Sequence, residues 1–465
     1  MKIVHDATVI TPACDTADVR VLEEHSFTFD AGRVIELGPA SSFARRVDAA
    51  EFDEVIDGRR RIVIPGLVNT HHHLYQSLTR CLPAVQNVGL FDWLLGLYEK
   101  WRHLDYEAVN LAAKVSIAEL LLHGCTTTSD HFYMFPRGGN VTMEAVLDAA
   151  EELGIRIHLC RGSMTLGQSH GGLPPDDCVE DDADVLADYE RTLDRFHDPS
   201  DYSRRRIDLA PCSPFNVTRE LMRDTVALAR ERGGVLLHTH LAETRDEERF
   251  CLEKYGVRPM QYLRELDFLG PDVYLAHCVF LNDAEIELMA SSGTAIAHCP
   301  TSNMRLGSGI ARLRELLAAG VRVGLGVDGS SSNDGGNLLA EAKATLLVAR
   351  VRDALDQSGA QQTMLQAGQA FRLATIGGAA CLNRPTLGHL NPGAAADFAM
   401  FRMDDIALAG AAAQDPLAAL MFCDAPRAEH VFVGGQVVVK RGNLVALDPH
   451  QLARRMNEMV AERFC

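Results

Sequence analysis

The sequence lacks the features of a membrane protein or of a small disulfide-stabilised secreted domain. No stretch reaches the roughly 18 uninterrupted apolar residues that a membrane-spanning helix needs. The opening residues, MKIVHDATVITPACD, hold no long apolar core of a signal peptide. The 12 cysteines form no C-x-x-C pair, and many lie in apolar segments, which favours reduced core cysteines over disulfides. We therefore expect a cytoplasmic protein without a membrane partner.

Positive charge is also scarce, with 45 Lys and Arg against 63 Asp and Glu and a formal net charge of -18. Such a surface repels phosphate backbones and anionic lipid, so we expect no nucleic-acid polymer as a partner. A neutral or cationic small molecule fits better. The stretch GLGVDG (324–329) matches G-x-G-x-x-G, but a helix-rich stretch follows it instead of a β-α-β unit. A dinucleotide site is therefore disfavoured.

The chain ends and the chain middle have different patterns. Residues 1–60 and 385–450 alternate apolar and polar residues, as short strands do. Between them, eight apolar runs alternate with helical stretches, which is the count of an α/β fold of the (β/α)8 TIM-like barrel type. We predict a barrel over 61–384, a small β-sandwich domain built from both chain termini (1–60 plus 385–450) and a C-terminal helix over 451–465. The predicted barrel strands are 62–70, 125–130, 155–162, 207–214, 235–240, 273–278, 294–300 and 323–329.

Histidine or aspartate ends five of these eight strands. A lone histidine at a strand end is more often structural than a ligand. Five such ends at one rim of a barrel, where barrel enzymes hold their active sites, instead indicate a divalent transition metal, most often zinc. The five strand ends are HHH (71–73), HTHLAE (238–243), AHC (276–278), HCP (298–300) and Asp328.

Strand alternation sorts these residues, because side chains two positions apart point to the same side. His71 and His73 can therefore share one ion, while His72 points away. His240 lies at its strand end, and Asp328 neighbours the first strand because a barrel closes on itself. We expect one metal ion with a water in its remaining position, which is the arrangement of a catalytic site. Its predicted ligands are His71, His73, His240 and Asp328.

Two further residues near these ligands suit proton transfer. Glu243 lies three residues after His240, in the loop above the predicted ion. Its structural alternative is an acid at a helix N-terminus. His277 ends the sixth predicted strand and can polarise a substrate or a bound water.

The motifs PGLVNTHHHL, HTHLAE, AHC, HCPTSN, GLGVDG and LNPGAAADF resemble the amidohydrolase superfamily. The similar branch contains cytosine, guanine and S-adenosylhomocysteine deaminases and s-triazine hydrolases, and the resemblance spans nearly the whole chain. It implies the same four metal ligands, and proton-transfer and orienting roles for Glu243 and His277. Two-metal relatives carry a carbamylated lysine on the fourth strand. No lysine lies between Lys114 and Lys254, so one ion is implied.

The resemblance implies a hydrolytic deaminase of an aromatic heterocyclic base, with one Zn2+ ion or, alternatively, Fe2+. Segments such as LVNTHHHLYQSLTR and SDHFYMFPRGG look most like the 8-oxoguanine deaminases, which yield urate and ammonia. In that chemistry Glu243 protonates a ring nitrogen, His277 stabilises the tetrahedral intermediate and Asp328 transfers the proton of the attacking water to the departing amine. Relatives are often dimers or larger, so we expect a homo-oligomer.

Two alternatives stay open. One is a hydrolase of another ring: isoxanthopterin, guanine, cytosine, or an amino- or chloro-s-triazine. The other is a metal-bound protein that has lost catalysis, which the presence of all three catalytic residues disfavours.

Four residues are candidates for binding a flat polar ring. Gln76 can hydrogen-bond through its amide, and Trp93 can stack on the ring or only pack a helix. Arg161 can pair with a ring oxygen or form a structural ion pair. Asn303 can read the ring edge or only shape its loop.

Overall fold

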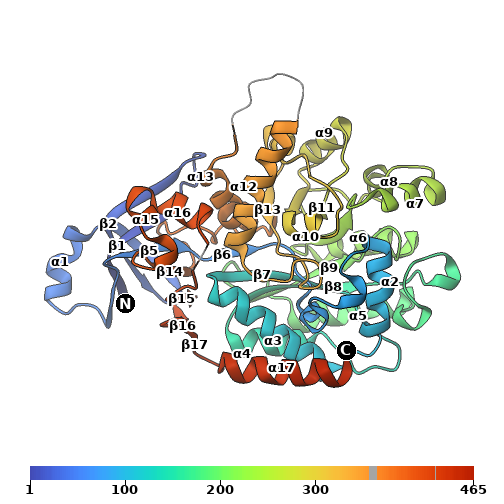
Figure 1. Ribbon diagram of the computed structural model, residues 1–465, viewed down its shortest axis with the longest axis horizontal. Helices are drawn as coiled ribbons and strands as arrows, with labels where there is room; N and C mark the ends of the chain where they lie inside the picture. The colour runs from blue at the N-terminus through green and yellow to red at the C-terminus, as the bar shows by residue number, and fades with distance from the viewer. Residues whose placement is uncertain (356–363, 425, 465) are drawn as a thin grey trace.

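The computed structural model describes residues 1–355, 364–424 and 426–464 (Figure 1). In this described part, eight parallel strands close into a barrel, which confirms the predicted fold class. The barrel runs in chain order from β6 to β13, and β13 pairs with β6 to close it. Its strands are β6 (Leu67–Asn69), β7 (Cys125–Phe132), β8 (Arg156–Ser163), β9 (Arg205–Pro211), β10 (Leu237–Leu241), β11 (Val273–His277), β12 (Ala295–His298) and β13 (Val323–Leu325).

The predicted strand over 62–70 is wrong as a single barrel strand. Residues Arg61–Pro65 form β5, which pairs with β1 and β14 outside the barrel, and β6 begins only at Leu67. The break falls at Gly66, whose backbone N–H donates to the carbonyl of Asp397 at 2.8 Å. A Cβ atom at Gly66 would lie 2.0 Å from Thr126 Oγ1, so only glycine allows this close approach. The Pro65-Gly66 pair marks a break in the apolar run, but the run does not show that its two halves belong to different sheets.

Helices follow the barrel strands, and their ends match local capping signals. The Thr218 side chain accepts from Leu221 N at the start of α6, which ends at Gly233 in a positive-φ conformation. The helices between β6 and β14 are α2 (Leu90–Trp101), α3 (Tyr106–Leu122), α4 (Glu144–Leu153), α5 (Asp182–Phe196), α6 (Arg219–Arg232), α7 (Arg245–Tyr255), α8 (Pro259–Glu265), α9 (Asp283–Ser292), α10 (Pro300–Arg305), α11 (Leu313–Ala318), α12 (Leu338–Leu355), α13 (Ala367–Arg372) and α14 (Gly378–Cys381). Shorter helical turns are η1 (Leu74–Thr79), η2 (Pro83–Val85), η3 (Gln168–His170), η4 (Asp176–Cys178) and η5 (Leu373–Gly377).

Strands from both chain ends form a second sheet beside the barrel, as predicted for the small domain. Figure 1 shows the blue and red strands lying together at the left. Of the nine described strands of this sheet, eight follow one hydrogen-bonded path from β17 to β3, and β4 lies off this path and pairs with β1. Phe398 stacks on Phe432 at 4.4 Å and meets Phe27 edge-on at 5.0 Å, so side chains from both ends share one apolar core. The strands are β1 (Lys2–Pro12), β2 (Val19–Asp30), β3 (Arg33–Pro39), β4 (Glu54–Asp57), β5 (Arg61–Pro65), β14 (Phe398–Arg402), β15 (His430–Val433), β16 (Gln436–Lys440) and β17 (Asn443–Leu444).

The last helix runs beneath α3 along the lower edge of Figure 1. Arg463 near its end forms an ion pair with Asp105 at 2.8 Å, which ties this helix to the start of α3. Of the predicted ranges, residue 465 of the C-terminal helix, residue 425 of the small domain and residues 356–363 of the barrel lie outside the described residues. The remaining helices are α1 (Ala40–Asp48), η6 (Ile406–Leu408), α15 (Ala411–Gln414), α16 (Pro416–Phe422) and α17 (Pro449–Arg463).

Two further expectations from the sequence concern membrane-spanning helices and the state of the cysteines. None of the helices in the described ranges combines the length and the apolar character that crossing a bilayer requires. Every cysteine in those ranges is a free thiol.

A buried ion pair joins the barrel to the terminal sheet. Asp397, just before β14, accepts from Arg156 Nε at 2.5 Å and from Arg156 Nη2 at 3.0 Å. Asp397 also accepts from Gly434 N at 2.6 Å, while Arg156 Nη1 donates to the carbonyls of Tyr202 and Ser203. Both side chains are at most 3% exposed. Removal of one partner therefore leaves an uncompensated buried charge.

We expect Asp397→Ala to lower the free energy of unfolding by about 3–5 kcal/mol, because Arg156 loses its only carboxylate partner among the described residues. Urea unfolding followed by circular dichroism measures this. The matched control is Asp404→Ala, which breaks an exposed pair with Arg402 and should leave stability unchanged. Equal stability of the two variants would contradict the interpretation.

Candidate active site

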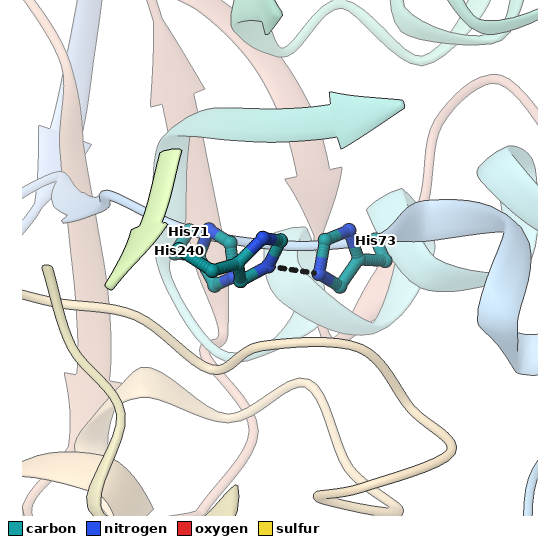
Figure 2. A group of neighbouring side chains, drawn as sticks. All are labelled: His71, His73 and His240. Atoms are coloured by element: carbon teal, nitrogen blue, oxygen red, sulfur yellow. Dashed lines mark hydrogen bonds between the residues drawn. The ribbon is translucent and has the colours of Figure 1, made fainter. Parts of the chain in front are cut away.

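The four predicted metal ligands lie together at the carboxyl-terminal end of the barrel strands. His71 and His73 follow β6, His240 lies on β10, and Asp328 follows β13. His73 Nε2 is 3.1 Å from His240 Nε2, and Asp328 Oδ1 is 3.3 Å from His71 Nε2 and 3.4 Å from His73 Nε2. Figure 2 shows the three imidazoles grouped, with the His73–His240 contact dashed. His72 belongs to none of the metal-compatible groups in the described residues.

Backbone carbonyls fix the tautomers of two of these histidines. His73 Nδ1 donates to the carbonyl of His131 at 2.6 Å, and His240 Nδ1 donates to the carbonyl of Cys212 at 2.7 Å. Burial lowers the pKa of both imidazoles, so they are neutral. A neutral imidazole with its proton on Nδ1 carries a bare lone pair on Nε2. Two lone pairs therefore face each other at 3.1 Å.

The third histidine is fixed by another histidine. His238 Nδ1 lies 2.6 Å from the carbonyl of Tyr274, which can only accept, so this nitrogen carries the proton. His238 Nε2 is then the acceptor for His71 Nδ1 at 2.8 Å. His71 Nε2 is left bare, and it has no hydrogen-bond partner in the described residues. The tautomers of His238 and His71 thus both follow from the backbone carbonyl of Tyr274.

This donor set fits a divalent cation. Three converging lone pairs repel one another unless a cation lies between them, and a carboxylate completes the group. The ligand atoms of His71, His73 and His240 lie within 4.8 Å of one another, and so do those of His71, His277 and Asp328. Three nitrogens and one oxygen are ligands that zinc takes in catalytic sites. Carbonyls or imidazoles that anchor the far ring nitrogen are the usual outer partners of such ligands.

Glu243, His277 and Asp328, the residues predicted to be proton-handling, form one group beside the predicted ligands. His277 Nε2 lies 3.6 Å from Glu243 Oε2 and 3.9 Å from Asp328 Oδ2. Burial raises the pKa of the Glu243 carboxyl to about 7. Burial alone would lower the pKa of the His277 imidazole, but the charges of Glu243 and Asp328 outweigh it and raise that pKa. An acid that is partly protonated near neutral pH thus faces an imidazole that favours its charged form.

The backbone and neighbouring groups direct the Asp328 carboxylate. Asp328 has a φ of 62° and His277 a φ of 69°, a left-handed conformation that non-glycine residues rarely adopt. Gly329 N donates to Asp328 Oδ1 at 2.7 Å, and the Ser332 hydroxyl donates to Oδ2 at 3.1 Å. Oδ1 therefore faces the histidine ligands, while Oδ2 faces His277.

A cavity opens above these residues. None of the described residues in its wall is a lysine or an arginine. A ligand with a phosphate or a carboxylate would find neither a lysine nor an arginine there, so the wall suits a neutral, partly apolar molecule. The lining residues are His73, Gln76, Leu90, Trp93, Leu94, Tyr133, Cys212, Phe215, Asn216, His240, Glu243, His277, Leu306, Asp328 and Ser332.

Two of the four predicted substrate-binding residues lie in this wall. The Gln76 side-chain oxygen is buried without a hydrogen-bond partner among the described residues, so it is available to a ligand. A Cβ atom at position 329 would lie 1.9 Å from that oxygen, so the amide position depends on Gly329. Trp93 Nε1 donates to the carbonyl of Ser331 at 3.3 Å, which fixes its indole in the wall.

The structure does not bring the other two into the cavity wall. The Arg161 guanidinium is buried in ion pairs with Glu180 at 2.6 Å and Asp188 at 2.7 Å, so it has no free donor pointing at the cavity. The Asn303 side-chain oxygen accepts from His277 Nδ1 at 3.0 Å. Asn303 thus contacts a proton-handling residue instead of lining the cavity.

Sequence reasoning missed several wall residues. Cys212, Phe215 and Asn216 follow β9 in the stretch APCSPFN. The usable signal was their position at the end of a barrel strand, the same signal that selected the histidines. Tyr133 follows β7 in the same way.

We expect His72→Ala to bind zinc as tightly as the unmodified protein does, because both His72 ring nitrogens lie outside the metal-compatible groups of the described residues. His71→Ala and His73→Ala should each lose more zinc affinity than the about 10–100-fold that loss of an outer partner causes. Metal analysis after dialysis and zinc titration of the apoprotein measure this, with thermal unfolding as the folding control. Equal losses in all three variants would show that His72 shares the ion.

Comparison with known proteins gives matches over nearly the whole chain. The profile of the Amidohydrolase family matches residues 62–438. The chain is 46% identical to an 8-oxoguanine deaminase of Pseudomonas aeruginosa over 91% of each sequence. It is 37% identical to an isoxanthopterin deaminase from an unknown prokaryote over 76% of each sequence. A zinc-complexed atrazine chlorohydrolase from Arthrobacter aurescens TC1 superposes with a TM-score of 0.91 at 34% identity, covering 99% of this chain and 100% of the other. The chain belongs to the amidohydrolase family.

Proposed function

We propose that this enzyme is a zinc-dependent deaminase that hydrolyses 8-oxoguanine to urate and ammonia. The observation that carries the proposal is the convergence of Glu243, His277 and Asp328 on three bare imidazole nitrogens, beneath a cavity wall whose described residues include no lysine or arginine. The 46% identity to an 8-oxoguanine deaminase supports this choice of ring.

His71, His73, His240 and Asp328 would hold the zinc ion, and Fe2+ is the alternative for the same donor set. A bound ion of this kind lowers the pKa of a water ligand to about 7, which supplies a nucleophile at neutral pH.

Asp328 and Glu243 divide the proton transfers in this proposal. Asp328 Oδ2 accepts the proton of the attacking water and later delivers it to the departing amine. Glu243, whose pKa is raised to about 7 by burial, protonates the ring nitrogen next to the amino-bearing carbon, which makes that carbon more electrophilic. One C–O bond forms and one C–N bond breaks, and the hydroxyl proton of the intermediate returns to Glu243, so water and 8-oxoguanine yield urate and ammonia.

His277 stabilises the oxygen that gains charge as the attack proceeds. Its Nδ1 donates to Asn303, so the ring is held with Nε2 facing Glu243 and Asp328. A raised pKa favours the charged imidazolium, which donates from Nε2 to developing negative charge.

The cavity wall suits a flat free base. Trp93, Phe215 and Leu306 supply apolar and aromatic surface, and the Gln76 side-chain oxygen can accept from a ring N–H.

A second candidate is a hydrolase of a pterin or an s-triazine. The 37% identity to an isoxanthopterin deaminase and the close superposition on an atrazine chlorohydrolase favour it. The proton-handling residues and the ion would act in the same way on these rings. The homo-oligomeric state and the cytoplasmic location stay predictions.

We expect ammonia release from 8-oxoguanine to exceed that from guanine, cytosine, isoxanthopterin and amino-s-triazines in a coupled ammonia assay. Formation of urate, followed by its ultraviolet absorbance, identifies the product. Ammonia release from another ring, without release from 8-oxoguanine, would overturn the proposed substrate and leave the assignment as a deaminase intact.

We expect Glu243→Gln to lower kcat by about 100- to 10,000-fold, because an amide cannot donate the proton that the ring nitrogen needs. Zinc content should stay at the level of the unmodified protein, since Glu243 is not a proposed ligand. The matched control is Glu248→Gln, a partly buried residue of α7 that pairs with Arg245 and Arg258 and not with the group at the strand ends, which should keep full activity. Unchanged turnover in Glu243→Gln would refute the proton-transfer role.

A further inference from the structure

Glu247 is a fully buried carboxyl that the proposed chemistry does not use. It lies in the first turn of α7 and is 0% exposed. It forms no ion pair with any described residue. Its two oxygens accept instead from two consecutive backbone amides, Ala242 N at 2.8 Å and Glu243 N at 2.9 Å. A buried carboxyl without a cationic partner is costly, so its two hydrogen bonds are its main compensation.

The two amides belong to a sharp turn that follows β10. Ala242 has a φ of 51°, so the chain leaves the strand direction at this residue. The carbonyls of Leu241 and Ala242 accept from Cys278 N at 3.0 Å and Phe280 N at 2.9 Å. The turn is therefore held on both sides. Its carbonyls accept from the residues after β11, and its amides donate to Glu247.

Helix capping does not account for this glutamate. Thr244 is the N-cap of α7, and its side chain accepts from Glu247 N. A glutamate in a capping box would accept from the N-cap residue's own N–H. The Glu247 side chain reaches past Thr244 to the two residues before it. Its hydrogen bonds thus fix the turn and not the helix end.

The turn sets the position of Glu243 relative to His277. Glu243 N is held by Glu247, and Glu243 Oε2 lies 3.6 Å from His277 Nε2. The same turn accepts from the amide of Cys278, the residue after His277. We propose that Glu247 is a positioning residue, which holds the Glu243 carboxyl over the reacting ring. This inference rests on the proposed proton transfer by Glu243.

Replacement by glutamine tests this with little change of volume. An amide has one acceptor oxygen, so one of the two turn amides loses its partner and faces an NH2 group. We expect Glu247→Gln to lower kcat about 10- to 100-fold with KM changed less than about threefold, as a displacement near 1 Å does. Zinc content should not change. Glu248→Gln, the neighbour on the same helix, is the matched control and should keep its kcat. An unchanged kcat in Glu247→Gln would overturn the proposal.

A double-mutant cycle separates positioning from a general structural role. If Glu247 acts only through Glu243, then Glu247→Gln lowers kcat in the unmodified protein and has no further effect in Glu243→Gln. If Glu247 only supports the fold, the same loss appears in both backgrounds, and the proposal is overturned. Thermal unfolding of all four proteins reports any loss of stability.

Crystal structures of the zinc-loaded protein and of Glu247→Gln give a readout without turnover. We expect the Glu243 carboxyl to move away from His277 in the variant. An unmoved carboxyl would refute the positioning role even if no heterocyclic base is hydrolysed. A moved carboxyl, with full turnover in Glu243→Gln, would instead refute the proposed function and keep the positional coupling.

Discussion

The backbone contacts between the last and the first barrel strand place the whole site. Leu325 of β13 pairs with Asn69 of β6, Thr70 N donates to the Leu325 carbonyl, and Asp328 N donates to the His71 carbonyl. These bonds bring residues 71 and 328, distant in sequence, to one rim of the barrel. Without this closure, the carboxylate would not reach the histidines, and the proton-handling group would lose Asp328. The site is therefore a property of the closed barrel and not of any single motif.

A second constraint is that the buried polar side chains at this rim of the barrel need hydrogen-bond partners. Carbonyls of three barrel strands or the loops that follow them serve His73, His240 and, through His238, His71. These contacts leave the metal-facing nitrogens bare and place every proton on the outer side of the rings. Backbone carbonyls thus set the orientation of the buried imidazoles. The proposed chemistry uses the imidazole lone pairs that accept no hydrogen bond from the described residues.

Much of this arrangement follows from the sequence, because strand ends and alternation are local properties. Strand ends brought the histidines and Asp328 to one rim, and the β-α repeat indicated the barrel. Arg161 shows where local reasoning stops: it also lies in a barrel strand, but Glu180 and Asp188 from the following segment pair with it. Gly66 shows the same limit for the fold, since the change of sheet depends on Thr126 and Asp397, which are remote in sequence. Long-range partners decide both cases.

The terminal sheet has a consequence for how the chain folds during synthesis. β1 and β5 lie near the start of the chain, while β14, the direct partner of β5, begins at Phe398. During translation, β5 therefore keeps an open, apolar edge until more than three hundred further residues have been made. The carboxyl that receives Arg156 arrives equally late. Contacts of such long sequence separation form slowly. During this interval β5 lacks its partner β14, and the Arg156 guanidinium, which is buried in the folded protein, has no carboxylate partner. A chain that ends before Phe398 would keep this edge of β5 unpaired, which favours aggregation.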